Sequence, residues 1–364
     1  MTARSQNPVK NYTKEWKEAE AFIEKSLPQS AMAVVKKIYT LAKKDKQDAQ
    51  VIKSLIYIGT LQEEIREDND QLNIAEIEKE ITTSREPATS ILKSHLAELY
   101  WNYFNKVRWT LYNRTETQNF KKDDIATWGA EDFHKKTTEL FLSSLKEYKM
   151  LQQTKLEPFE ALITKGNMRH LRPTLYDLLA FRALAYFEND EKEITKPAYA
   201  FEIDQASAFD PAADFATRKF ITRDSLSDSH KAIQLFQQLI AFHLNDSKPD
   251  ALIDADLQRL AYIKDKSVHP DKDKLYYTAL NHIARQYGSL PAAAQAWFLM
   301  ASELVDKAGE YKPHGDTTHR FDKVKAKEIL QTILAQKDSS EGKQTPTTCY
   351  VISIPVPWNS NWKK

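Results

Sequence analysis

Two histidines and an aspartate in one short polar segment carry side chains that can bind zinc. His314, Asp316 and His319 lie within KPHGDTTHRFD, between two expected helices. Imidazole and carboxylate groups are zinc ligands, but a structural site needs a complete set at suitable spacing. The segment offers no third firm ligand and no helical spacing. We therefore expect a polar loop with solvated histidines rather than a zinc site.

A second cluster, in AFHLNDSKPDALIDADL, is rich in the carboxylates that calcium prefers. It consists of His243, Asp246, Asp250, Asp254 and Asp256. A calcium-binding loop also needs a glycine at its turn and a closing glutamate, and this stretch has neither. Because carboxylates stabilise helix N-termini, Asp246 and Asp250 are predicted to be helix caps instead.

The third candidate is an aromatic run that could stack against a ligand. Trp101, Tyr103, Arg108 and Trp109 lie within WNYFNKVRW. Aromatic faces and a guanidinium group together suit a sugar or a peptide, so these four residues are the candidate interaction surface. Tyrosine and tryptophan at helical spacing are also common in helical cores, and the core alternative is the favoured one.

Four arginines have a structural role in our interpretation. Asp177 and Arg182 are close enough along one expected helix to form a polar pair, and the general role expected is pairing between helices. The arginines are Arg114, Arg169, Arg172 and Arg182.

The sequence contains no G-x-S-x-G, H-E-x-x-H or phosphate-loop motif. These motifs are the local signatures of nucleophilic, zinc-dependent and nucleotide-dependent catalysis. We therefore predict no catalytic residue, no metal and no cofactor, and the chain is not expected to be an enzyme.

The composition restricts the elements that can position these side chains. Only 7 of 364 residues are glycine, which argues against glycine-rich phosphate loops, dinucleotide-binding folds and turn-rich β-sandwiches. The net charge of +1 provides no broad basic field, so nucleic acid is disfavoured as a partner. No apolar stretch of about 18 residues occurs, so membrane insertion is not expected. The one cysteine, Cys349, cannot form an internal disulfide.

Apolar residues recur at steps of three and four along most of the chain, which is typical of amphipathic helices joined by short loops. The pattern predicts an all-α fold, an irregular TPR-like array of helical hairpins (an α-α superhelix) with one long ordered loop near 189–228. Expected helices cover 12–25, 28–42, 51–61, 72–84, 87–104, 132–151, 173–187, 229–244, 249–263, 274–287, 291–308 and 321–336.

The same pattern suggests a domain plan. A disordered N-terminus, 1–11, precedes an N-terminal helical-hairpin region at 12–188 and an irregular aromatic-rich loop at 189–228. A C-terminal helical-hairpin region at 229–338 follows, and the chain ends in a non-helical tail at 339–364. In the loop, aromatic rings are expected to pack over the helical surface.

Several segments resemble the N-terminal helical region of alpha-2-macroglobulin family proteins from Bacteroidetes-type bacteria. The resemblance includes irregular segments as well as helical stripes, and it extends over about 12–342. It is carried by residues 12–44, 95–104, 113–128, 171–184, 195–202 and 239–260. In this family the helical region follows a secretion signal and precedes many β-sandwich domains. The resemblance therefore implies part of a protease-inhibitor protein in the periplasm or cell envelope.

Neither a signal peptide nor the macroglobulin and thioester domains of that family occur in this sequence. If the start is genuine, the chain is expected in the cytoplasm. The tail TPTTCYVISIPVPWNSNWKK departs from helical composition, and reading its codons one nucleotide earlier gives an amphipathic charged pattern. A frameshift that truncated a longer protein is the hypothesis for this tail, and an apolar tail that pairs with a partner strand is the alternative.

Three functions remain open at this stage. The first is a non-catalytic helical scaffold or interaction module, the N-terminal fragment of a macroglobulin-like protein, whose partner is a macroglobulin-type domain or a peptide. The second is a free-standing helical-repeat adaptor that binds a peptide or protein. The third, with less support, is a carbohydrate- or peptide-processing enzyme that uses the aromatic surface.

Overall fold

The computed structural model describes residues 10–66, 69–112, 124–163, 168–190, 199–288 and 290–335. They form two compact units. The first comprises Met1–Arg169 with Pro173–Tyr186, and the second comprises His170–Arg172 with Phe187–Lys364. The expected disordered N-terminus and non-helical tail fall almost entirely outside the described residues.

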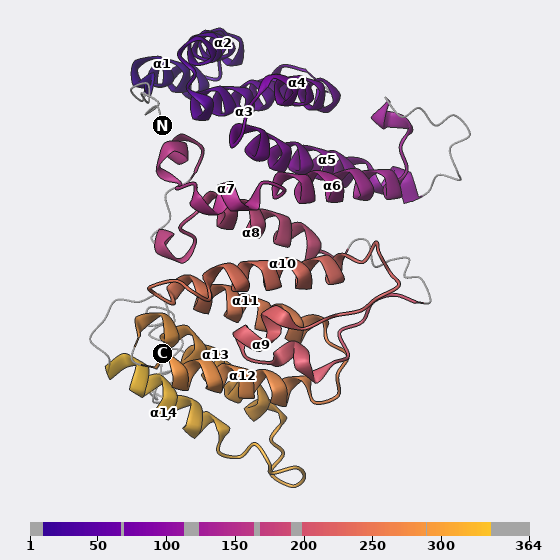
Figure 1. Ribbon diagram of the computed structural model, residues 1–364, viewed down its shortest axis with the longest axis vertical. Coiled ribbons are helices and arrows are strands. Elements are labelled where there is room, and N and C mark those ends of the chain that lie inside the picture. The colour runs from indigo at the N-terminus through magenta and orange to yellow at the C-terminus, as the bar shows by residue number, and fades with distance from the viewer. Residues whose placement is uncertain are drawn as a thin grey trace, which may run out of the picture. The chain divides into compact units, whose positions relative to one another are not determined.

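Helices build the first unit (Figure 1). Because only Lys46 and Gln47 separate α2 from α3, these two helices run antiparallel and pack along each other. The helices α1 and α2, α4 and α5, and α5 and α6 also pack in pairs. The helix bounds are α1 Thr13–Glu24, α2 Pro28–Asp45, α3 Asp48–Ile65, α4 Asp70–Thr83, α5 Ala88–Tyr112, α6 Ala130–Ser144, α7 Tyr148–Gln153 and α8 Leu175–Phe187.

The second unit continues the pattern. Consecutive helices pack in the order α10, α11, α12, α13 and α14, and the short α9 packs on α10. The bounds are α9 Ala212–Thr217, α10 Asp228–His243, α11 Asp250–Lys266, α12 Lys272–Gln286, α13 Ala294–Lys307 and α14 Asp322–Ala335. Among the described residues, the β-type pairs are two isolated bridges, Lys155 with Thr174 and Ile203 with Ser267. The predicted all-α hairpin array is therefore confirmed. No described helix is long and apolar enough to cross a membrane.

The expected helix positions hold with local differences. The helix expected at 132–151 is divided into α6 and α7, because Leu145 and Lys146 donate to carbonyls only three residues back and tighten the chain. The helix expected at 87–104 continues to Tyr112. The helices range from 6 to 25 residues, so the pairs do not repeat with one length.

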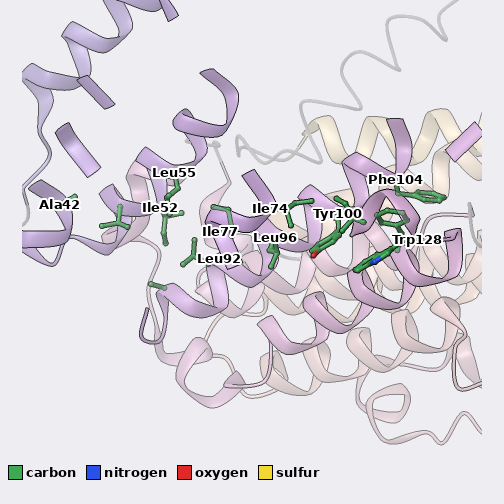
Figure 2. Close-up of a cluster of buried hydrophobic side chains, with 14 residues drawn as sticks. Ala42, Ile52, Leu55, Ile74, Ile77, Leu92, Leu96, Tyr100, Phe104 and Trp128 are labelled. Atoms are coloured by element: carbon green, nitrogen blue, oxygen red, sulfur yellow. The ribbon is translucent and has the colours of Figure 1, made fainter. Parts of the chain in front are cut away.

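The core of the first unit joins α3, α4 and α5. Figure 2 shows Ile52 and Leu55 of α3 beside Ile77 of α4, while Tyr100 and Phe104 of α5 lie next to Trp128 at the other end. Burying each large apolar side chain contributes about 1.5–3 kcal/mol, which favours the paired state over isolated helices.

Of the segment expected as a long ordered loop, 189–228, residues 191–198 lie outside the described residues. Its described part contains a 3-10 turn at Ala206–Phe209 and then α9. The expected packing of its aromatic rings is confirmed for Phe209, Phe215 and Phe220, which are buried, but not for Tyr199, which is 62% exposed.

Close approach of α3 and α4 requires glycine at one position. A Cβ atom at Gly59 would lie 2.4 Å from Nδ2 of the buried Asn73. Although alanine is usually better than glycine inside a helix, we expect Gly59→Ala to lower the free energy of unfolding by about 1–3 kcal/mol through overpacking. Urea unfolding measures this change.

Two further variants control this prediction. Gly309→Ala should cost little, because nothing lies within 4 Å of its added Cβ. Adding Asn73→Ala to Gly59→Ala should recover part of the loss. Unchanged stability in Gly59→Ala would show that the two helices do not approach as described.

Candidate functional site

The four residues of the candidate aromatic surface do not lie together on one exposed surface, because some of their rings pack between helices. The ring of Trp101 packs against Phe104, Tyr186 and His134, with ring centroids 5.3, 5.2 and 5.7 Å away. These partners belong to α5, α8 and α6. Trp101 is therefore part of the packing among three helices.

The other three candidates lie toward the end of α5. Tyr103 packs on Phe133 at a centroid distance of 5.6 Å. The Arg108 guanidinium lies 5.0 Å from the ring centroid of Trp109, and Trp109 is 68% exposed. Trp101 and Tyr103 thus have the core role of the alternative interpretation, and Trp109 is the aromatic ring of this set that lies mainly in solvent.

This division predicts different costs for two tryptophan substitutions. Trp101→Ala should lower the free energy of unfolding by about 3–5 kcal/mol, since it removes a ring packed between helices. Trp109→Ala should change it by less than about 0.5 kcal/mol, as exposed substitutions usually do. Equal costs in urea unfolding would contradict this assignment.

The side chains of the two candidate metal sites do not come together into a set of ligands. Among residues 10–335 that the structure describes, no group of three His, Cys, Asp or Glu side chains could hold a metal ion. His314 and Asp316 are exposed, whereas the Nδ1 atom of His319 lies 2.7 Å from Asp322 at the start of α14. The segment between α13 and α14 is polar, and His314 is exposed as expected, whereas His319 is half-buried against Asp322 and is not a solvated histidine.

In the acidic cluster, local contacts occur beside two long-range ones, because Asp250 lies 3.9 Å from His170 and Asp254 lies 3.5 Å from Arg172. His243 pairs with Asp246 at 2.7 Å, and Asp254 accepts a hydrogen bond from Gln258. The predicted caps are wrong in detail, because Asp246 bonds to His243 and α11 has Pro249 as its N-cap residue. Asp250 instead contributes a carboxylate to the first turn.

Arginine pairing between helices is confirmed, but one partner differs. Arg182 donates to Ser94 and Glu98 of α5 at 3.0 and 2.8 Å, rather than to Asp177. Asp177 accepts a 2.8 Å bond from the backbone of Thr174 and caps α8.

Two of the other arginines also have nearby acidic groups. Arg169 pairs with Glu160, and Arg172 lies 3.5 Å from Asp254. Arg114 lies outside the described residues.

The most unusual polar group is a charge that the sequence analysis did not single out. Arg259 of α11 is fully buried, and its guanidinium donates to carbonyl oxygens of Ala208 and Asp210 at 2.6 and 3.1 Å. Its Nε donates to Asp256 at 3.0 Å, and its plane covers the Phe215 ring at 4.3 Å. A buried cation is tolerated only with such partners.

Burial and the ion pair with Arg259 have opposite effects on the pKa of the Asp256 carboxyl group. Burial raises the pKa of Asp256, because the charged form loses its water, and the adjacent Arg259 opposes that rise.

Other side chains hold the same segment by its backbone. Gln237 of α10 donates to the carbonyls of Phe215 and Arg218 at 2.8 and 2.7 Å. Ser267 donates to Ile203 at 2.7 Å, and a ring nitrogen of His230 lies 2.8 Å from the Phe220 carbonyl. These bonds replace the regular hydrogen bonds that irregular backbone lacks.

The outer end of this segment exposes large apolar side chains. Ile221 is 85% exposed and Leu226 is 65% exposed. The buried Asp224 carboxylate accepts backbone bonds from Leu226 and from Phe201, so it ties the two ends of the segment together. We call Tyr199, Ile221 and Leu226 the apolar tip.

A cleft of about 220 Å³ lies beside the buried pair. Its walls come from α11, from α12 and from the segment around Asp210. The sequence signal that could have revealed the ion pair of Asp256 and Arg259 is two opposite charges, three residues apart, within the apolar run of α11.

Comparisons with protein-family models, with curated proteins and with solved structures found no match.

The role of Arg259 predicts a local effect of a conservative substitution. Arg259→Lys keeps the charge but cannot reach both carbonyls and Asp256 with a planar group. We expect trypsin to cleave after Lys219 and Arg223 about tenfold faster, since local opening exposes the segment.

Arg285→Lys on α12 is the matched control, because Arg285 is exposed. Its cleavage rate should equal that of the unmodified chain. An unaltered rate in Arg259→Lys would mean that the guanidinium does not hold the segment.

Proposed function

We propose that this chain is a non-catalytic helical interaction module that binds a protein partner through the apolar tip. The proposal rests on one observation: hydrogen bonds fix the backbone of this segment, while its large apolar side chains are exposed to solvent. Side chains of α10, of α11 and of Ser267 at the end of α11 hold the backbone between Ile203 and Phe220, yet Ile221 and Leu226 face solvent.

The physical argument concerns entropy and solvation. Exposed apolar side chains gain free energy when a partner covers them. A segment already fixed in one conformation loses little further entropy on binding, so more of that gain becomes affinity. Binding residues on loops that a rigid scaffold positions are common for this reason.

Basic side chains surround the apolar tip. Lys219 and Arg223 are exposed on either side of Ile221. The partner surface that fits is therefore an apolar pocket with an acidic rim.

The sequence resemblance supports a more specific form of this proposal. In that form, the module belongs to the N-terminal region of a macroglobulin-type protease inhibitor in the periplasm or cell envelope, and a macroglobulin-type domain is the partner. Its helical pairs would then correspond to a degenerate TPR-like array. A free-standing adaptor is the second candidate, and the cleft beside α11 favours it because a partner side chain could enter there.

The apolar tip predicts which substitutions abolish binding. A partner is first isolated on the immobilised chain and then purified, and its dissociation constant is measured by calorimetry. The double variant Ile221→Asp, Leu226→Asp should bind at least about tenfold more weakly, as expected when central apolar contacts are lost.

The control variant also replaces an exposed apolar residue with aspartate, but at another place in the second unit. Val324→Asp on α14 alters a side chain that is 52% exposed, and it should leave the dissociation constant unchanged. If the double variant retains full affinity and an unchanged unfolding curve, the apolar tip is not the binding surface.

A further inference from the structure

Between α9 and α10 the backbone is extended, and its side chains alternate between the interior and solvent. It runs without a turn or bend from Arg218 to Thr222, and Arg218 has extended dihedral angles, with φ −65° and ψ 147°. Phe220 is buried, whereas Lys219 and Ile221 are exposed. Because a period of two is the property of a strand, this stretch has strand geometry, although the bridges that the described residues form lie elsewhere.

One edge of this extended stretch is held by α10. The carbonyl oxygen of Arg218 accepts a 2.7 Å bond from Gln237, and that of Phe220 lies 2.8 Å from a ring nitrogen of His230. In an extended chain, the N–H and C=O groups of one residue point to one edge, and those of the next residue point to the other. Since the bonded carbonyls belong to alternate residues, the backbone groups of the residues between and beyond them point away from α10.

The opposite edge is unpaired. We call the backbone N–H and C=O groups of Lys219 and Ile221, together with the N–H of Arg223, the outer edge. Within the part of the chain that the structure describes, no protein group forms a hydrogen bond with any of them. An unpaired strand edge is a template for pairing with another chain, and proteins usually cover an edge that they do not use. This edge belongs to exposed residues and is held in one conformation from behind.

The side chains beside the outer edge define what can pair with it. Ile221 is 85% exposed, and Lys219 and Arg223 lie two residues to either side of it. Among the described residues, neither of these two cations has a carboxylate within ion-pair distance, whereas Arg218 pairs with Asp210. In antiparallel pairing, directly opposite residues share one face of the sheet. Acids opposite the two cations and an apolar residue opposite Ile221 are therefore the favoured arrangement.

The same rule argues against a second copy of this chain. Two copies that paired antiparallel about Ile221 would place Lys219 of each opposite Arg223 of the other. Like charges directly opposite each other are destabilising in a sheet. An acidic partner avoids this repulsion and gains an attraction, so charge selects a different protein.

We propose that the outer edge binds an extended peptide segment of a partner protein as an antiparallel β-strand, with the pattern acid-x-apolar-x-acid along that segment. The acids lie opposite Lys219 and Arg223, and the apolar residue lies opposite Ile221. Bonds between the two backbones supply affinity, and the alternating side chains supply specificity. This inference rests on the proposed function, because it specifies how the partner of the apolar tip binds.

The test uses a synthetic peptide, acetyl-Thr-Glu-Thr-Val-Thr-Glu-Thr-amide, on the intact chain. Its binding at pH 7 is followed by the amide chemical shifts and the amide hydrogen exchange of Lys219, Ile221 and Arg223. We expect saturable shifts and slower exchange at these three amides. The absence of saturable shifts up to about 5 mM peptide would overturn the proposal.

Two N-methylated peptides test the backbone pairing. An N-methyl group on the valine removes an N–H that points to the outer edge, whereas one on the threonine after the valine lies on the far edge of the peptide. The first should bind at least about tenfold more weakly, and the second should bind as the unmethylated peptide does. Equal binding of the two would contradict strand addition.

A further peptide tests the charge pattern. Replacing both glutamates by lysine keeps the alternation and places cations opposite Lys219 and Arg223. We expect this peptide to bind about tenfold more weakly at low salt, because two attractive pairs become repulsive. Equal affinity would overturn the acidic pattern.

Variants of the chain separate this inference from the proposed function. Lys219→Pro removes an N–H from the outer edge and is compatible with the extended Arg218 before it, and Lys219→Ala is the control for the lost charge. The purified partner should bind Lys219→Pro at least about tenfold more weakly than Lys219→Ala. Equal affinities of these two, with binding lost in the Ile221→Asp, Leu226→Asp variant, would overturn strand addition and leave the apolar tip as the binding surface.

The reverse outcome is also distinct. Full affinity of the double variant for the purified partner, with all peptide results as expected, would overturn the apolar tip and not the outer edge. If Lys219→Pro changes the unfolding curve, the two N-methylated peptides decide the question, because they leave the chain unaltered.

Discussion

The buried guanidinium of Arg259 is the interaction on which the second unit depends. Its cost of desolvation is offset only because Asp256 and two backbone carbonyls surround it. Those carbonyls belong to irregular backbone about 50 residues earlier in the chain. One charge therefore joins α11 to a segment whose own secondary structure is a short 3-10 turn and the six-residue helix α9.

This constraint acts on both sides of the segment. On the outer side, the fixed segment presents Ile221 and Leu226 to solvent, and on the inner side it forms a wall of the cleft. Arg259 donates to Asp256 and to the backbone of the segment, and it lines the cleft together with them. Loss of the guanidinium would thus alter both surfaces together, whereas substitutions in either surface should act separately.

The sequence predicted the helices well, because amphipathic periodicity is a local property. Residues 28–42 and 249–263 have apolar side chains at steps of three and four. The first range lies in α2, and the second lies in α11 from Asp250 onward. It predicted the candidate sites less well. Trp101 and Trp109 have the same type and similar neighbours, but only the structure shows that one ring lies between helices and the other in solvent.

By itself, the sequence determined an all-α chain of hairpins with few glycines and little net charge. The tertiary structure decided which polar groups meet. Arg259 contacts Ala208 and Asp210, and Arg182 contacts Glu98 rather than Asp177. The physical reason is that helix formation depends on residues a few positions apart. The partner of a buried charge instead depends on which distant segments pack against it, and a single sequence does not encode that in any local pattern.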